Sequence, residues 1–505
     1  MEAGYERLSR LDESFLSFET EDTPMHIALT GIFSNGGLAT KKGGIDATRI
    51  RKHVESRLHL VPRYRQRLHL VPMLHDTVWV DDDAFEIGYH VRHTSLPRPG
   101  SEAQLRTRCA EILERPLDRK RPLWEMWAIE GLEGGRFALI FKVHHCMVDG
   151  VGGVELLVNL LTMEPLDEVP APLPWQPRPL LTDSGLLGSE LLRRGRSLAD
   201  AGRKLSQSLT EPATLGRAAL RRASAVWSLA NGGLRPKPET PVNGPIGPHR
   251  RIEWMSLSLG EIKEVRDRLG GTVNDVVLAT IAGGLRRFLA GEDVEALKVA
   301  CPVNVRGPTE GGKTSNMVSA WILSLSLREP DARRRLAMIQ ETTAELKRTS
   351  QADGAKTLLE AAEWTGAAVL HAAIRMISNR MPVNLVVTNV PGPPFPLYLL
   401  NAKLESAYPF LPLFESQGLG IALFRYQGEL YIGLTGEWDL LARIDQLPAC
   451  LDEAFAELRM LAGKGGAARR PATLGRAPAS RGTTPRHRGN GAPLAAAPGG
   501  SSSSS

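Results

Sequence analysis

The sequence contains few cysteines and no long apolar run. Cys109, Cys146, Cys301 and Cys450 are the four cysteines of the 505-residue chain, and they lie far apart with no CxxC spacing. Such usage is typical of a reducing compartment and disfavours a disulfide scaffold or a structural zinc site. No run approaches the roughly 18 apolar residues that a membrane-spanning helix needs, so any membrane contact is expected to be peripheral.

The sequence also shows no signal-peptide pattern. Residues 1–463 carry no large excess of charge of either sign. It opens with MEAGYERLSRLDESF, which is acidic and amphipathic rather than basic and then apolar, so a cytoplasmic location is expected. The formal net charge of +6 comes from residues 464–505, which carry seven Lys and Arg and no acid. Without them, 55 Lys and Arg face 56 Asp and Glu, a net charge of −1. The high pI therefore gives no reason to expect nucleic-acid binding.

Length and periodicity predict an α/β protein with two domains. A hydrophobic content of 42% with 23% charged residues is ordinary for a soluble protein, and the length allows two separate cores. Strand-like and helix-like patterns alternate in residues 1–165 and again in 251–463. Residues 166–250 contain two stretches rich in Pro and Gly around a helical segment, which is typical of a linker. The Gly-, Pro- and Ser-rich tail, 464–505, is predicted to be disordered.

The predicted elements follow from alternation and helical spacing. In the first domain we expect strands at 26–33 and 89–96, helices near 46–59, 101–117 and 151–161, and a hairpin of 124–132 with 136–145. In the second we expect strands at 252–259, 298–305, 317–327 and 384–392, a hairpin at 420–436, and helices at 260–269, 273–290 and 443–461.

The linker helix carries mostly positive charge. Between residues 185 and 230 there are eight cations and three acids, with leucines between them. Such a helix either lies on an anionic membrane surface or packs a solvated face on its own protein. The sequence leaves both interpretations open.

The stretch KVHHCMVDG, residues 142–150, is the strongest candidate for chemistry. Adjacent histidines on a strand point to opposite faces, so His144 and His145 are poorly placed to hold one metal ion, and no metal site is expected. No GxSxG elbow exists, and nothing in the sequence places Cys146 beside a base, which disfavours a nucleophile. General-base catalysis by one histidine, supported by Asp149, and a buried structural histidine pair both remain open.

A second pattern, GPTEGGKT at residues 307–314, matches the phosphate-binding GxxxxGK[ST] loop. That loop needs a helix directly after the lysine, so that free N–H groups face the phosphates. Here the following SNMVSAWILSLSL alternates like a strand, and Pro308 lacks an N–H donor. We therefore expect a glycine-rich loop and keep nucleotide binding as the weaker alternative.

The HxxxD pattern of His145 to Asp149 resembles that of chloramphenicol-acetyltransferase-like acyltransferases, and the full HHCMVDG resembles the HHxxxDG signature of the bacterial wax ester synthase/diacylglycerol acyltransferase family. The resemblance extends over about residues 1–463 and includes, in family order, LSRLDESFLSFETEDTPMHI, WVDDDAFEIGYHVRHTSLPRPG, RPLDRKRPLWEMWAIEGLEGGRFAL, NGPIGPHRR, GTVNDVVLA and TNVPGPPFPLYL. Condensation domains of peptide synthetases share HHxxxDG, but the flanking PLW and NDVVLA blocks favour the lipid family.

The resemblance implies roles for individual residues. His145 resembles the general base, His144 a supporting residue, and Asp149 a residue that orients the site, with Gly150 allowing the exit into a helix. Asn274 and Asp275 match the Asn-Asp pair of the family, although helix capping explains Asn274 equally well. Asn316 follows Ser315 where the family more often has Gly-Asn, and is a further candidate for active-site support.

The resemblance also implies the fold and the reaction. It predicts two chloramphenicol-acetyltransferase-like domains, α+β two-layer sandwiches, with the active-site channel between them. The reaction is expected to be acyl transfer from acyl-CoA, a substrate rather than a cofactor, to diacylglycerol or a long-chain alcohol. No cofactor, metal or nucleic acid is implied, and a peripheral place on the inner face of the membrane or on lipid inclusions is expected. A non-catalytic lipid-surface protein with the same fold is the alternative, and the sequence gives no indication of oligomeric state.

Overall fold

The computed structural model describes residues 4–40, 44–74, 76–148, 157–209, 240–304, 318–349 and 383–464. These residues form two six-stranded sheets and one three-stranded sheet. The predicted disordered tail, the loop 307–314, and Asp149, Gly150 and Asn316 lie outside the described residues.

The first six-stranded sheet has the strand order β12-β13-β2-β7-β6-β5. Its strands are β2 (His26–Ser34), β5 (Val91–Ser95), β6 (Trp124–Leu132), β7 (Arg136–His144), β12 (Tyr398–Leu399) and β13 (Ala402–Phe410). The predicted hairpin is confirmed, since β6 and β7 pair antiparallel. Gly134 and Gly135 make its turn with φ of 75° and 65°, values that glycine adopts without steric cost.

Helices α2 (Ala47–Arg57), α3 (Ile87–His90) and α4 (Glu102–Leu113) contact strands of this sheet. Ser101 and Gln104 form a capping box at the start of α4, which fixes its first turn. The helix ends at Leu113 and not at 117 as expected, because Pro116 disfavours helical geometry at the residue before it. The expected strand 89–96 begins only at Val91, since Tyr89 and His90 belong to the short helix α3.

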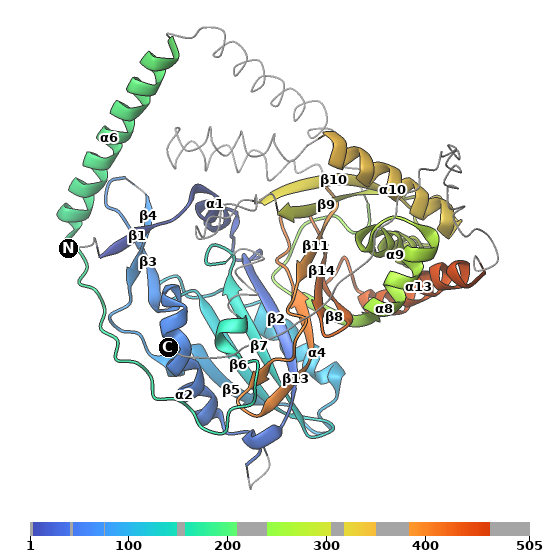
Figure 1. Ribbon diagram of the computed structural model, residues 1–505, viewed down its shortest axis with the longest axis horizontal. Helices are drawn as coiled ribbons and strands as arrows, with labels where there is room; N and C mark the ends of the chain where they lie inside the picture. Colours follow the sequence, from blue (N-terminus) through green and yellow to red (C-terminus); the bar gives the residue numbers. More distant parts are fainter. Residues whose placement is uncertain are drawn as a thin grey trace, which may run out of the picture. The chain divides into compact units, whose positions relative to one another are not determined.

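The second six-stranded sheet has the order β10-β9-β11-β14-β15-β8. Its strands are β8 (Arg250–Ser258), β9 (Ala296–Asn304), β10 (Val318–Ser326), β11 (Leu385–Pro391), β14 (Leu419–Tyr426) and β15 (Glu429–Glu437). Helices α8 (Leu259–Leu269), α9 (Val273–Phe288), α10 (Ala332–Thr349) and α13 (Leu447–Lys464) gather along one side of it (Figure 1). Apolar side chains of these helices and strands form one continuous core.

The strands β12 and β13 were not expected, and they connect the two halves of the chain. They come from the second half, yet β13 pairs with β2 in the first sheet. A second core combines residues of the first sheet with Trp254, Phe424 and Tyr431 of the second. The predicted boundaries at 165 and 251 stay a prediction, but the sequence did not indicate that residues 398–410 complete the first sheet.

The linker helix α6 (Asp183–Leu209) packs with a small sheet that was also not expected. This sheet has the order β1-β4-β3, with β1 (Tyr5–Arg7), β3 (Gln66–Leu70) and β4 (Thr77–Asp81). Glu190 of α6 is fully buried and lies 2.9 Å from Arg7, and Arg194 lies 2.6 Å from Asp76. The first half of α6 is therefore held by ion pairs with its own protein. Among the described residues, no helix combines the length and apolarity needed to cross a membrane.

Candidate active site

Strand β7 brings the two histidines to the end of a central strand of the first sheet. The strand ends at His144, and His145 is the first residue of the turn that follows. The alternation of a strand therefore applies to His144 but not to His145. The α1 helix (Arg10–Phe18) contacts both imidazole rings, through Phe15 on His145 and Glu19 at its C-terminal end on His144.

His144 is fully buried, and its hydrogen bonds define its ring orientation. Its backbone N–H donates to the carbonyl of Leu123, in the PLW block, over 2.9 Å. Its Nδ1 accepts from the backbone N–H of Cys146 at 3.1 Å. A neutral imidazole with an accepting Nδ1 carries its proton on Nε2, and Nε2 lies 3.3 Å from Oε1 of Glu19.

Glu19 connects His144 to Arg119 and to the backbone of Met25. Its Oε2 accepts from Nε and Nη2 of Arg119 at 2.8 and 2.6 Å, and its Oε1 accepts from the N–H of Met25 at 3.1 Å. Burial raises the pKa of this carboxyl, but the contacts with His144 and Arg119 outweigh burial and lower the pKa to about 2. Glu19 is therefore ionised throughout the neutral range.

His145 is partly exposed and is held by its backbone and by stacking. Its N–H donates to the carbonyl of Met25 at 2.8 Å. The ring of Phe15 stacks on its imidazole with centroids 3.8 Å apart and planes 16° from parallel. Because the nitrogens of imidazole lie at the ring edge, stacking fixes the ring plane and leaves hydrogen bonding at the edge possible. Such a histidine is suited to proton transfer.

Cys146 lies in a setting that disfavours nucleophilic chemistry. It is 3% exposed and packs with Trp79 and Leu123. Burial, together with the charges of Asp12 and Glu19, raises the pKa of its thiol well above the usual range. Only the thiolate is a strong nucleophile, so the environment agrees with the expectation that Cys146 takes no chemical part.

The second half places Asn274 and Asp275 at the start of α9. Asp275 accepts from the N–H of Thr272 at 2.7 Å in a capping box and from the hydroxyl of Thr343 at 2.8 Å. Asn274 accepts from Nδ2 of Asn389 at 3.4 Å, so the NDVVLA and TNVPG blocks meet here. Asp275 thus has a capping role, and the support of His145 by either residue stays a prediction.

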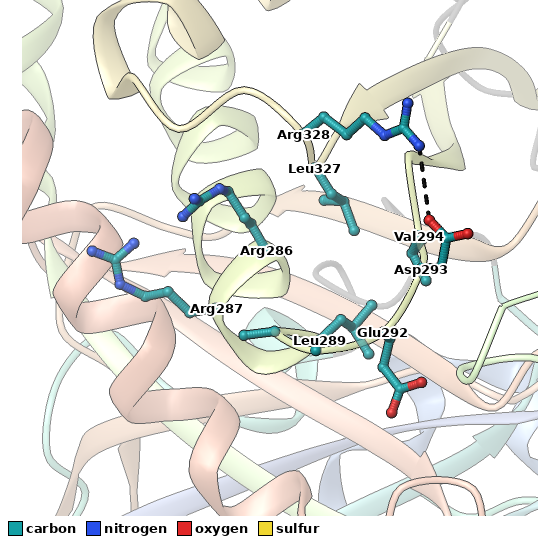
Figure 2. Close-up of a pocket in the computed structure, with 10 residues that line it drawn as sticks. Arg286, Arg287, Leu289, Glu292, Asp293, Val294, Leu327 and Arg328 are labelled. Carbon is teal, nitrogen blue, oxygen red and sulfur yellow. Dashed lines mark ion pairs between the residues drawn. The ribbon is translucent and has the colours of Figure 1, made fainter.

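A cavity of about 460 Å³ lies at the other end of α9. The helix rises ~1.5 Å per residue, so Arg286 lies roughly 18 Å along its axis from Asn274. Figure 2 shows Arg286 and Arg287 extending away from Arg328, whose guanidinium turns to Asp293. Arg287 is paired with Glu457 at 2.6 Å. The arginines do not converge on one point, and we do not assign the active site to this cavity.

Two other interpretations of the sequence, a metal site and a phosphate-binding loop, concern residues that the structure describes only in part. Within the described ranges, no group of three or more His, Cys, Asp or Glu side chains is arranged to hold a metal ion. The strand expected after the glycine-rich loop is confirmed as β10, which begins at Val318. The loop itself lies outside the described residues.

Comparison with known proteins decides the family. The model of the wax ester synthase/diacylglycerol acyltransferase catalytic domain matches residues 8–277, and the model of the C-terminal domain of the same family matches residues 314–459. The chain belongs to the wax ester synthase/diacylglycerol acyltransferase family. A candidate diacylglycerol O-acyltransferase of Mycobacterium tuberculosis is 34% identical over 474 residues, which are 90% of each chain. A second one from this organism is 31% identical over 462 residues, 89% of this chain and 95% of that one.

Solved structures agree with the family and the fold. The wax ester synthase/diacylglycerol acyltransferase from Marinobacter aquaeolei is 28% identical, with a TM-score of 0.65 over 90% of this chain and 100% of that one. The first condensation domain of the calcium-dependent antibiotic synthetase is 15% identical, with a TM-score of 0.56 over 91% of this chain and 97% of that one. The latter likeness concerns the fold alone. The predicted two-part acyltransferase fold is confirmed, and the protein is an acyltransferase of this family; the channel between the halves stays a prediction.

Sequence reasoning missed four residues around the histidines: Phe15, Glu19, Met25 and Arg119. Phe15, Glu19 and Met25 stand in the block of residues 8–27 and Arg119 in the block of residues 115–139, both of which resemble the family. The spacing of Phe15 and Glu19, four residues apart near the end of an amphipathic helix, was the available signal for a shared face. Nothing local indicated that Arg119, 100 residues from Glu19 in the chain, completes the ion pair.

Proposed function

We propose that this protein transfers the acyl group of an acyl-CoA to the hydroxyl of diacylglycerol, and of long-chain alcohols, with His145 as the general base. The observation that carries the proposal is the setting of His145. In a chain that matches both domains of the family, the ring of His145 is fixed by Phe15 and its backbone by Met25, beside a fully buried His144.

The reaction needs one base and no covalent enzyme intermediate. His145 removes the proton of the acceptor hydroxyl while the oxygen attacks the thioester carbonyl. The tetrahedral oxyanion then collapses, the C–S bond breaks, and the imidazolium returns the proton to the sulfur of coenzyme A. A general base contributes roughly 10²- to 10⁴-fold in rate, and positioning of the two substrates contributes further. Acyl-CoA is a substrate here, and no cofactor or metal takes part.

An assay with two competing acceptors tests the proposal. Purified protein is given palmitoyl-CoA together with equal amounts of diacylglycerol and hexadecanol, and coenzyme A release and both esters are measured. We expect coenzyme A release matched by triacylglycerol, with wax ester as a second product. If neither ester forms, the protein is a non-catalytic lipid-surface protein or acts on other substrates. Equilibrium binding of ATP tests the weaker phosphate-loop alternative, for which we expect no affinity.

We also propose that the protein works at the surface of the cytoplasmic membrane or of lipid inclusions, because its acceptors are insoluble in water. The supporting feature is the outward face of α6, where Leu191 and Leu192 are 52% and 67% exposed. Arg193 is engaged with Glu190 at 3.0 Å, so the exposed leucines carry this argument better than the cations.

Replacing Leu191 and Leu192 by Ser should reduce flotation with anionic liposomes while sparing turnover of detergent-dispersed acceptor. Met338 and Met460, which are 45% and 57% exposed on other helices, provide the matched control when both are replaced by Ser. Equal flotation of the two double variants would remove α6 from the proposal.

A further inference from the structure

One face of α1 contacts both histidines of the signature. Phe15 and Glu19 are four residues apart, and residues at this spacing lie on the same side of a helix. Phe15 stacks on His145, and Oε1 of Glu19 lies 3.3 Å from Nε2 of His144. The orientation of both rings therefore depends on the place of this one helix.

The same carboxylate oxygen also supports the backbone that holds His145. Oε1 of Glu19 accepts from the N–H of Met25, while the carbonyl of Met25 accepts from the N–H of His145. On the other side, Nδ1 of His144 accepts from the N–H of Cys146. His144 thus contacts Glu19 directly, while His145 and Cys146 are each connected to Glu19 through one intermediate, Met25 and His144 respectively.

Arg119 fixes the other oxygen of Glu19 and the end of α1. Its Nε and Nη2 donate to Oε2 of Glu19, and Nη2 also donates to the carbonyl of Leu16 at 2.9 Å. The Glu19 side chain is 8% exposed, whereas the Arg119 side chain is 47% exposed. The pair therefore has its negative charge on the buried side, toward the histidines, and its positive charge toward solvent.

We propose that Glu19 is a positioning residue for acyl transfer, which holds the His144–His145 turn and, together with Arg119, sets the electrostatic potential at His145. The inference rests on the proposed function of His145 as the general base. It adds a specific role for an ion pair that touches neither reacting atom.

Other ionisable groups of neighbouring elements also act on this corner of the protein. They are Asp12 and the buried Glu13 of α1, Arg63, His26 of β2, Lys142 of β7, Arg250 of β8 and Cys146. All of them stay unchanged in the variants below, so a difference between variants reports the Glu19–Arg119 pair.

Two single variants should move the pH profile in opposite directions. Glu19→Gln keeps an oxygen beside Nε2 of His144 but removes the negative charge and leaves the Arg119 cation, which disfavours the imidazolium form of His145. The acid limb of kcat/KM should then move to lower pH, by several tenths of a unit to about one unit. Arg119→Met leaves the carboxylate alone, so the acid limb should move to higher pH. The double variant should return close to the wild-type limb.

The positioning role should appear in kcat. In Glu19→Gln the new amide N–H₂ faces the N–H donors of Arg119, which loosens the turn, and kcat should fall about 10- to 100-fold. The KM for palmitoyl-CoA should stay nearly unchanged, because the ion pair contacts no substrate. The double variant removes the facing donors and should recover part of kcat.

Glu190 supplies the matched control. This residue of α6 is fully buried and forms ion pairs with Arg7 of β1 at 2.9 Å and with Arg193 of α6 at 3.0 Å. Glu190→Gln breaks a buried ion pair by the same chemical change and should lower stability while leaving kcat and the pH profile unaltered. A loss in Glu19→Gln that Glu190→Gln matches would show that Glu19 is a structural residue only.

The wild type and His145→Ala are measured in the same series. An inactive wild type, or an active His145→Ala, would contradict the proposed function itself. If those two proteins behave as expected but the acid limbs of kcat/KM in Glu19→Gln and Arg119→Met do not shift, or shift in the same direction, the inference about Glu19 is wrong. Arg119→Met changes a half-exposed side chain, so the test remains available if Glu19→Gln folds poorly.

Discussion

Strands β7 and β14 are both central strands of a six-stranded sheet, yet their buried residues differ in kind. Each is one of the two middle strands of its sheet. Residues 419–424 of β14 are buried and apolar or glycine, and the one charged residue, Arg425, is half-buried near its end. In β7, Lys142 and His144 are 1% and 0% exposed.

Strand β14 is stabilised by apolar packing, whereas β7 also needs hydrogen-bond partners for its buried polar side chains. A buried polar group is costly unless it is hydrogen-bonded. Nζ of Lys142 donates to the carbonyls of Ile112 and Arg115 at the end of α4, and His144 is bonded to Cys146 and faces Glu19. Polar contacts of Lys142 with the end of α4 and of His144 with Glu19 at the end of α1 thus hold the last part of β7. His145 directly follows this part of the strand.

The largest expected effect concerns the contact between the two sheets. A Cβ atom on Gly433 of β15 would lie 1.7 Å from the carbonyl oxygen of Pro409 in β13. Gly433→Ala should therefore separate the sheets and lower the free energy of unfolding by more than about 3 kcal/mol, or prevent folding. Gly463→Ala, where a Cβ meets open space, should stay within about 1 kcal/mol of the wild type in urea unfolding. Similar stabilities for the two variants would contradict the close packing of β13 on β15.

The next effect depends on pH and tests the contribution of the buried Glu19 carboxylate, which contacts His144 of β7. The pKa of Glu19 is about 2 in the folded protein against an ordinary value of 4.5. A depressed carboxyl pKa stabilises the fold above the ordinary pKa, and this contribution is lost as pH falls from about 4.5 toward 2. Its upper limit is about 3 kcal/mol.

Urea unfolding of wild type and Glu19→Gln between pH 7 and 3 measures this contribution. We expect the wild type to be the more stable protein at pH 7, the difference to stay nearly constant down to about pH 5, and the difference to shrink between there and pH 3. A difference that does not vary with pH would show that the carboxylate is not stabilised by His144 and Arg119.

The smallest effect compares the charged residues of the two strands directly. Lys142→Met removes the donor from two carbonyls at the end of α4 and should cost about 1–2 kcal/mol. For Arg425, Nε is buried and has no hydrogen-bond partner in the part of the chain that the structure describes, and burial lowers the pKa of its guanidinium. Arg425→Met should therefore change the free energy of unfolding by less than about 0.5 kcal/mol or raise it. A larger loss for Arg425→Met than for Lys142→Met would reverse the comparison.

Local patterns predicted most elements but not their long-range pairing. The β6–β7 hairpin, β2, α9 and the β14–β15 hairpin follow from alternation, glycine turns and capping residues. No strand was expected between residues 392 and 420, although β13 there completes the first sheet. The residues AKLESAYPF alternate only in part, and a strand pattern does not specify which sheet the strand will join.

The candidate site shows the same limit. The HHxxxDG signature located His144 and His145, because it consists of adjacent residues. The family resemblance then predicted His145 as the base and His144 as its support. The contacts that orient them come from Phe15, Glu19 and Arg119, which are more than 20 residues away in the chain. The strand rule also failed at His145, because β7 ends one residue earlier.

The central claim, that His145 is the base of acyl transfer, is tested most directly by single-turnover rates of His145→Ala beside Cys146→Ala. Both variants are given palmitoyl-CoA and diacylglycerol at pH 7, with acyl-CoA affinity and circular dichroism measured on the same samples. Loss of the base should lower the rate roughly 10²- to 10⁴-fold in His145→Ala with acyl-CoA affinity retained, while Cys146→Ala should stay within about twofold of the wild type because no step uses a thiolate. A folded His145→Ala protein with a near-normal rate, or an inactive Cys146→Ala protein, would contradict the account.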